Sequence, residues 1–258
     1  ILDIPVFHDD QHGTAIITTA ALINALDISG KSIKEIKVVV NGAGASAQAC
    51  TELFKNSGVP NENIIMLDRK GVIYKGRPDG IDQWKSRYAI ETDLRTLEDA
   101  IDGADVFLGL SRAGLVSKDM IAKMSKNPIV FALANPEPEI SYKQATSVRK
   151  DIIMATGRSD HPNQVNNVLG FPFIFRGALD VRARDITTGM KMAATQALAA
   201  LAKEPVPDYI SHAYSGESMQ YGPEYIIPKP FDRRVLIWEA ADVAEAAVNE
   251  GISAIKPE

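Results

Sequence analysis

The chain begins with a polar segment whose residue types suit metal binding or acid–base chemistry. Asp9 and Asp10 are adjacent, and His8 and His12 flank them. Carboxylate oxygens suit a hard dication such as Mg²⁺ or Mn²⁺. Two histidines four residues apart would suit zinc on a helix, but the glycine and the N-cap-type Thr14 that follow argue against a helix here. In a third interpretation, one of the aspartates only caps the apolar helix that follows.

A glycine-rich turn follows the first β-branched run of the chain, residues 36–40. Gly42, Gly44 and Ala47 give this turn the G-x-G-x-x-A pattern of dinucleotide-binding proteins. The first glycine permits a tight turn, the second lets the backbone approach a pyrophosphate, and the alanine lets the next helix pack closely on the strand. The N-terminus of that helix would offer N–H groups to the phosphates. The alternative is a tight turn in a fold that binds no nucleotide.

Asp68 follows the second apolar run, residues 63–67, in the place of the acid that bonds the adenosine ribose in such proteins. This position favours NAD, because the 2′-phosphate of NADP would meet a carboxylate. Arg69 and Lys70 come next and could neutralise that phosphate, so NADP remains possible. The alternative for these two residues is a solvated turn before Gly71.

Asparagine side chains stand out at two places. Asn135 follows the apolar run 128–134, at the carboxyl end where open α/β sheets bind ligands. Asn166 and Asn167 lie in a second polar segment. An amide can bond a carboxylate or a hydroxyl without adding charge. A turn at Asn135 and a polar loop at Asn167 are the alternatives.

The elements that must position these residues alternate along the chain. Near-continuous apolar runs predict five strands, at residues 36–40, 63–67, 104–110, 128–134 and 151–155. Helical patterns separate several of them. We therefore expect an α/β fold with a Rossmann-like, doubly wound, mainly parallel sheet, helices on both faces and a helical C-terminal layer. The predicted segments are residues 1–34, with the polar segment and a buried helix, a dinucleotide-binding domain at 35–175, and the helical layer at 176–258.

Composition narrows the class of protein. The 258 residues carry a formal net charge of -5, with 45% hydrophobic residues and one cysteine. This predicts a globular protein of a reducing compartment, the cytoplasm, with no disulfide framework. It offers no positive field for nucleic acid, and no apolar run approaches the roughly 20 residues of a membrane helix.

Five segments together resemble the malic enzymes in their bacterial form. They are HDDQHGTA from residue 8, VVVNGAGASAQA from 38, FALANPEPE from 131, ATGRSDHPNQVNNVLGFPFIFRGALD from 155 and YIIPKPFD from 225. The resemblance covers nearly the whole chain. It implies the oxidative decarboxylation of L-malate to pyruvate and CO₂, with NAD or NADP and a divalent cation, Mg²⁺ or Mn²⁺.

The resemblance also implies roles for single residues. Asp10 resembles one of three carboxylates that bind the metal, and Asp9 its neighbour, which supports an active-site lysine. Asn135 and Asn167 resemble the amides that hold malate. The cofactor contacts it implies are Gly42, Gly44, Ala47, Asp68, Ser111 and Asn135.

The family's other two metal carboxylates and its catalytic tyrosine and lysine lie upstream of the HDDQHGTA segment. We therefore expect this chain to be the cofactor domain of a longer enzyme, one that forms a homodimer or a higher homo-oligomer and acts on small molecules. Two alternatives stay open. The enzyme could serve mainly as an oxaloacetate decarboxylase, or the chain could be a dinucleotide-binding module without catalysis.

Overall fold

The computed structural model describes residues 4–214 and 219–255. The chain divides into two compact units, residues 25–164 and residues 1–24 with 165–258. We call them the sheet unit and the helical unit. These divisions fall at residues 24 and 164, whereas the sequence predicts boundaries at 34 and 175. The predicted functional domains remain a prediction.

A seven-stranded sheet in the order β3-β2-β1-β4-β5-β6-β7 forms the sheet unit. Neighbouring strands are parallel, except that β3 runs antiparallel to β2. The bounds are β1 Val38–Asn41, β2 Ile64–Asp68, β3 Gly71–Val72, β4 Val106–Gly109, β5 Ile129–Ala132, β6 Ile153–Thr156 and β7 Asn163–Gln164. All five predicted strands are present within a few residues. The two shortest, β3 and β7, were not predicted, because two residues leave no periodic pattern.

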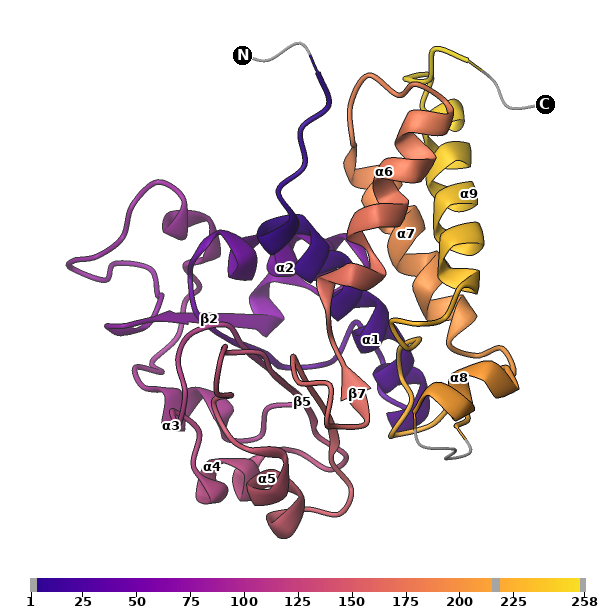
Figure 1. Ribbon diagram of the computed structural model, residues 1–258. Helices are drawn as coiled ribbons and strands as arrows, with labels where there is room; N and C mark the ends of the chain where they lie inside the picture. Colours follow the sequence, from indigo (N-terminus) through magenta and orange to yellow (C-terminus); the bar gives the residue numbers. More distant parts are fainter. Residues whose placement is uncertain (1–3, 215–218, 256–258) are drawn as a thin grey trace. The chain divides into compact units, whose positions relative to one another are not determined.

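Helices cover this sheet on both faces. In Figure 1, α2 (Ala45–Asn56) lies above the strands, and α3 (Leu97–Ile101), α4 (Lys118–Lys123) and α5 (Tyr142–Val148) lie below them. Side chains of the last three helices share one buried core with Val39, Phe107 and Val130 of the sheet. Short 3-10 turns, η2 at Asn61–Asn63 and η3 at Lys85–Tyr88, lie between the longer elements. The doubly wound α/β fold is confirmed.

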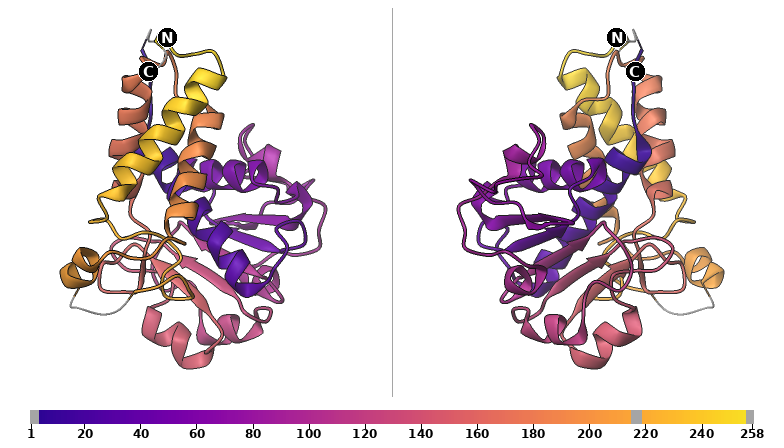
Figure 2. Two further views of the ribbon diagram at one scale, coloured as in Figure 1. Left: turned by 90° about the vertical axis from the view of Figure 1, so that its right-hand side faces the viewer. Right: turned by 90° about the vertical axis from the view of Figure 1, so that its left-hand side faces the viewer.

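The longest elements of the helical unit are helices, with irregular segments between them. These helices include α6 (Phe171–Asp180), α7 (Thr188–Leu201), α8 (Asp208–Ala213) and α9 (Arg234–Asn249), and the 3-10 turn η4 (Asn167–Leu169) precedes α6. Figure 2 shows α6 and α7 side by side with α9. α6 and α9 approach closely at Gly177, where a Cβ atom would lie 2.5 Å from the carbonyl oxygen of Ala240. No helix among the described residues is long and apolar enough to cross a membrane.

The polar segment at the start of the chain is helical, which corrects one prediction. Residues Asp9–Gly13 form a π-helical turn, η1, that runs directly into α1 (Thr14–Ser29). Thr14 has helical backbone angles and is not an N-cap. Its hydroxyl donates back to the carbonyl oxygen of Asp10 at 3.2 Å. A five-residue turn with i to i+5 bonding leaves no 3.6-residue pattern in the sequence, so it is read as a loop.

Candidate functional site

The glycine-rich turn of the sheet unit has the shape that bound phosphates require. Gly42 has φ +138°, and a Cβ atom there would lie 2.6 Å from the carbonyl oxygen of Leu110 in the loop after β4. Gly44 is the N-cap residue of α2, and no side chain caps that helix. A Cβ atom at Gly44 would have no atom within 4 Å, so the helix N-terminus opens onto free space. This cradle fits a pyrophosphate.

Asp68 ends β2 and holds four donors. Its Oδ1 accepts from the backbone N–H of Lys70 at 2.9 Å and from Nη1 of Arg77 at 3.0 Å. Its Oδ2 accepts from Nη2 of Arg77 at 2.7 Å and from Nζ of Lys85 at 2.9 Å. A carboxylate has about four acceptor positions, and all four are used here. A ribose hydroxyl would have to displace one of these donors.

The electrostatics around Asp68 follow from these bonds. Burial acts to raise the pKa of Asp68, but the hydrogen bonds from Arg77 and Lys85 outweigh it and hold the pKa well below its usual range. Asp68 is therefore ionised, and the two cations leave one positive charge in excess. Arg77 is itself fixed by donation to the carbonyl oxygens of Val72 and Gly80. Asp82 also interacts with Lys85, so Lys85 is shared between two acids, and it is the cation of this cluster that is exposed enough to meet an anion.

Ser111 and Asn135 occupy equivalent places on neighbouring strands. Ser111 lies in the loop after β4 and Asn135 in the loop after β5, and both are exposed. β1 and β4 are adjacent, and the strand order reverses between them. Open α/β sheets bind their ligands outside the carboxyl ends of the strands at this point. The fold thus brings the glycine-rich turn and Ser111 to one crevice edge, with Asn135 one strand further on.

Asp9 and Asn167 meet in the helical unit, although 158 residues separate them. Nδ2 of Asn167 donates to the carbonyl oxygen and to Oδ2 of Asp9, both at 3.1 Å. Oδ1 of Asn167 accepts from the Thr14 hydroxyl at 3.2 Å. Gly13 leaves room for the carboxylate, since any Cβ there would collide with Oδ1 of Asp9. The asparagine is therefore held in one orientation.

One oxygen of the Asp9–Asn167 pair has no hydrogen-bond partner among the described residues. It is the buried Oδ1 of Asp9. Burial raises the pKa of Asp9, while the Asn167 bond opposes that rise. The neighbouring Asp10 is exposed. Neither carboxylate accepts a helix N–H within the described part of the chain, so their geometry does not support the capping interpretation.

His12 and Lys191 are two further titratable residues of the helical unit whose pKa values are shifted. Burial lowers the pKa of His12 to about 4, and the charges of Lys191 and His8 push it in the same direction. Burial also lowers the pKa of Lys191. The imidazole is thus neutral near pH 7. The described residues nevertheless contain no group of three or more His, Cys, Asp or Glu that could hold a metal ion.

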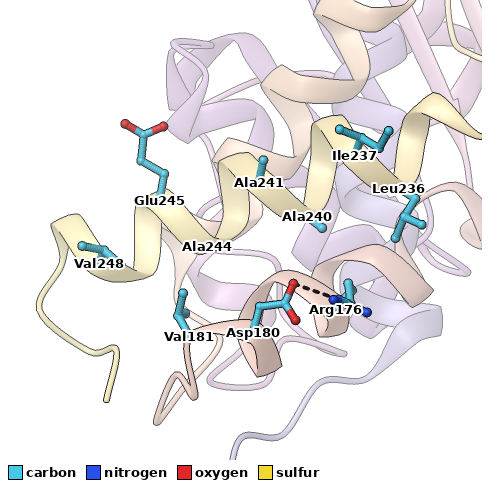
Figure 3. Close-up of a pocket in the computed structure, with 10 residues that line it drawn as sticks. All are labelled: Arg176, Asp180, Val181, Leu236, Ile237, Ala240, Ala241, Ala244, Glu245 and Val248. Atoms are coloured by element: carbon cyan, nitrogen blue, oxygen red, sulfur yellow. Dashed lines mark hydrogen bonds and ion pairs between the residues drawn. The ribbon is translucent and has the colours of Figure 1, made fainter. Parts of the chain in front are cut away.

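A separate groove of about 620 Å³ lies between α6 and α9. Apolar side chains of α9 line most of it, and the ion pair of Arg176 with Asp180 lies at its edge, at 2.8 Å (Figure 3). None of the predicted site residues lines this groove. Its charged lining residues, Arg176, Asp180 and Glu245, are all exposed, and we do not treat it as the candidate site.

Strand order, glycine-rich turn and helix N-terminus together define a dinucleotide-binding domain of the doubly wound α/β class. The chain matches the family "Malic enzyme, NAD binding domain" over residues 11–210. It therefore belongs to the malic enzyme family.

Individual relatives agree with this assignment. The chain is 59% identical over 253 residues to an NADP-dependent malic enzyme of Rhizobium meliloti, covering 98% of this chain and 33% of that protein. It is 53% identical to an NAD-dependent malic enzyme of the same organism, covering 98% and 33%. A crystal structure of the Entamoeba histolytica malic enzyme matches with a TM-score of 0.87 at 39% identity, covering 100% of this chain and 52% of that one. The chain thus spans about a third of these two curated relatives.

Sequence reasoning missed three residues of the site. Arg77 and Lys85 hold Asp68, whereas the sequence pointed to the adjacent Arg69 and Lys70. Glu139 is buried beneath the loops that carry Ser111 and Asn135. The repeated acidic pattern Pro-Glu-Pro-Glu was the only local signal for it.

Proposed function

We propose that the full-length protein is an NADP-dependent malic enzyme, which oxidises L-malate and decarboxylates the product to pyruvate and CO₂. The observation that carries this function is the identity of 59% across 98% of the chain with a protein of that name. The chemistry needs a hydride acceptor, a proton acceptor for the C2 hydroxyl and stabilisation of the ketone oxygen while the carbon–carbon bond breaks.

The charge balance at Asp68 favours NADP over NAD. The sequence alone favours NAD, because it presents a carboxylate to the ribose. Arg77 and Lys85 already saturate that carboxylate and leave a positive charge in excess. A 2′-phosphate would meet Lys85, whose side chain is 24% exposed, while the buried Arg77 holds Asp68 in place. Relatives named for either cofactor are similar to this chain, so identity alone does not separate the two.

The phosphates would lie on the glycine-rich turn. Gly42 and Gly44 leave the required space, and the uncapped N-terminus of α2 would donate N–H groups. Ala47 is buried in α2, where a larger side chain would push the helix off the sheet. Ser111 and Asn135 would line the crevice edge. The nicotinamide, when bound, accepts the hydride.

The helical unit would contribute to the metal and the substrate. Asp10 would be one ligand of Mg²⁺ or Mn²⁺, since its carboxylate is exposed and its chemistry suits a hard dication. The unpaired Oδ1 of Asp9 fits a second polar partner. A single exposed carboxylate does not make a cation site, so further ligands would come from elsewhere in the full-length protein. The dication, when bound, polarises the oxygen on C2.

Two amides would orient the diacid. Asp9 fixes the amide of Asn167 through two hydrogen bonds, which use both of its N–H groups, so one of them would turn from Asp9 to the diacid on binding. Asn135 would provide a second neutral contact to the diacid and would also contact the cofactor. We further propose a cytoplasmic homodimer or higher homo-oligomer, with the catalytic tyrosine and lysine outside this chain.

Product analysis tests the assignment. The full-length protein is incubated with L-malate, NADP and Mn²⁺, and pyruvate and NADPH are counted. We expect the two products in equal amounts. Release of pyruvate from oxaloacetate with no malate oxidation would instead favour the decarboxylase, and cofactor binding without any turnover would favour a non-catalytic module.

A further inference from the structure

Glu139 is a buried acid that the proposed chemistry does not use. Its side chain is fully buried, in the loop that follows β5. Oε1 accepts from the backbone N–H of Ser111, and Oε2 accepts from the backbone N–H of Ala134, both at 3.1 Å. One carboxylate therefore joins the loop after β4 to the loop after β5. Ser111 makes one of these contacts and Asn135 directly follows Ala134, which makes the other, and both are among the proposed cofactor contacts.

Backbone bonds reinforce the same junction. The N–H of Gly114 donates to the carbonyl oxygen of Pro138 at 3.2 Å, and the N–H of Val116 donates to that of Glu139 at 3.1 Å. These bonds hold the far end of the β4 loop. At its near end, the N–H of Leu110 donates to the carbonyl oxygen of Asn41 at 3.0 Å, and the next residue, Ser111, donates to the Glu139 carboxylate. Removing this carboxylate would free Ser111, whereas Leu110 and the far end of the loop would stay attached.

The sheet makes room for this carboxylate at Gly109. A Cβ atom on that residue would lie 2.6 Å from both Oε1 and Oε2 of Glu139. Gly109 is paired in register with Asn41 of β1, so the two residues face the same side of the sheet. Asn41 is 6% exposed, and its Nδ2 has no hydrogen-bond partner among the described residues. The carboxyl ends of β1, β4 and β5 thus share a small buried polar layer.

This layer lies directly behind the phosphate turn. Leu110 donates its N–H to the carbonyl oxygen of Asn41 at 3.0 Å, and its own carbonyl oxygen packs against Gly42. Ser111 directly follows Leu110, so Glu139 holds the residue next to the one that packs against the glycine-rich turn. Burial raises the pKa of Glu139, and the backbone N–H groups that it accepts from oppose that rise.

We propose that Glu139 is a positioning residue for the dinucleotide: it fixes the spacing between the loops of Ser111 and Asn135 and so the width of the crevice behind the glycine-rich turn. This role rests on the proposed function for the identity of the ligand, but it concerns binding and not malate chemistry. Its chemical basis is that a carboxylate has only acceptors, and both loops offer it only donors.

The substitution Glu139→Gln tests this role in the full-length protein. The amide NH₂ would face one of the two N–H groups, donor against donor, and release one loop. Titration with NADPH, followed by nucleotide fluorescence, should give a Kd raised about tenfold or more, the scale of a lost bond to a charged group. In hydrogen exchange, the amide of Ser111 or that of Ala134, whichever faces the new NH₂ group, should lose protection, while those of Gly114 and Val116 should keep it.

Glu137→Gln is the matched control, because Glu137 is exposed two residues earlier in the same loop. Its NADPH affinity should stay within about twofold of the parent. Glu139→Asp is the second variant in case the glutamine variant does not fold. It keeps the charge, but its shorter side chain reaches only one loop, so we again expect weaker NADPH binding.

The outcomes separate this role from the proposed activity. If a folded Glu139 variant binds NADPH as the parent does and only melts at a lower temperature, Glu139 is merely structural and the inference is wrong. If the parent binds NADPH but does not oxidise malate, the proposed function fails while the Kd comparison still decides the role of Glu139. A parent protein that binds no dinucleotide overturns both.

Discussion

The two units differ in how completely their acids are paired, although Asp232 of the helical unit is buried and paired with Arg234. In the sheet unit, Asp68 has four donors and Glu139 accepts from two loops. In the helical unit, Oδ1 of Asp9 and both carboxylate oxygens of Glu239 have no hydrogen-bond partner within the described residues. The sheet unit brings together the glycine-rich turn, the N-terminus of α2 and the paired Asp68 that we propose as the nucleotide site. The helical unit offers single polar groups, such as the unpaired Oδ1 of Asp9, which by themselves do not make a site.

This difference explains why one chain indicates nucleotide binding by several features and metal binding by a single residue. A dinucleotide needs a turn, a helix N-terminus and a charged pocket, and one βαβ fold supplies all three. A dication bound by carboxylates needs several ligands at once. Asp10 is the only residue of this chain proposed as such a ligand.

The largest effect should come from Asp10→Ala in the full-length protein. We expect malate turnover with Mn²⁺ to fall about 100-fold or more, since a dication contributes several kcal/mol to such chemistry. NADPH affinity should not change, because Asp10 lies outside the sheet unit. Asp180→Ala removes a surface carboxylate of the same unit and serves as control. Unchanged Mn²⁺ affinity in the Asp10 variant would mean that the helical unit carries no metal ligand there.

Lys85→Ala should have the next largest effect, confined to the cofactor. We expect kcat/KM for NADP to fall about tenfold to 100-fold, the scale of one lost charge-assisted bond, with little change for NAD. Lys75→Ala removes an exposed charge from the same segment and should leave both values unchanged. An equal loss for both cofactors would contradict a 2′-phosphate contact and would make Lys85 a purely structural partner of Asp68.

The smallest effect concerns the pH dependence of stability and Glu239, whose two carboxylate oxygens have no partner among the described residues. Burial raises the pKa of Glu239 well above its ordinary value of 4.5. The folded state therefore binds this proton more tightly than the unfolded state, and stability is lost as the pH rises above about 4.5. Asp68 has the opposite sign, because its lowered pKa removes stability only as the pH falls below its ordinary 3.8.

Glu239→Gln should remove the alkaline loss. The free energy of unfolding is measured by urea denaturation at pH 5 and pH 8 for the variant and the parent. We expect the difference between variant and parent to shift by about 1 kcal/mol in favour of the variant from pH 5 to pH 8. Glu245→Gln changes an exposed acid on the same helix and should show no such difference. A parent protein equally stable at both pH values would mean that Glu239 has a partner in the full-length protein.

Local patterns made the sheet unit predictable. Gly42, Gly44 and Ala47 lie within six residues, and the strand before them is short and β-branched, so spacing alone indicates the turn. Asp68 was placed correctly at the end of β2. Its partners were not, because Arg77 and Lys85 follow it by 9 and 17 residues across an irregular segment without a period.

The helical unit was less predictable for the same reason. The bonds between Asp9 and Asn167 join residues 158 positions apart, and no local pattern encodes such a pair. Thr14 resembles an N-cap in sequence, yet the π-helical turn before it continues into α1. Tertiary contacts decided both cases. The resemblance to a family indicated these residues where spacing did not.

A steady-state assay with L-malate, comparing NADP with NAD in the presence of Mn²⁺, is the most direct measurement. The full-length protein should reduce NADP in step with malate consumption, with kcat/KM for NADP above that for NAD, and should stop when the dication is chelated. Malate oxidation that is absent with both nucleotides, or that continues unchanged after chelation, would contradict the account.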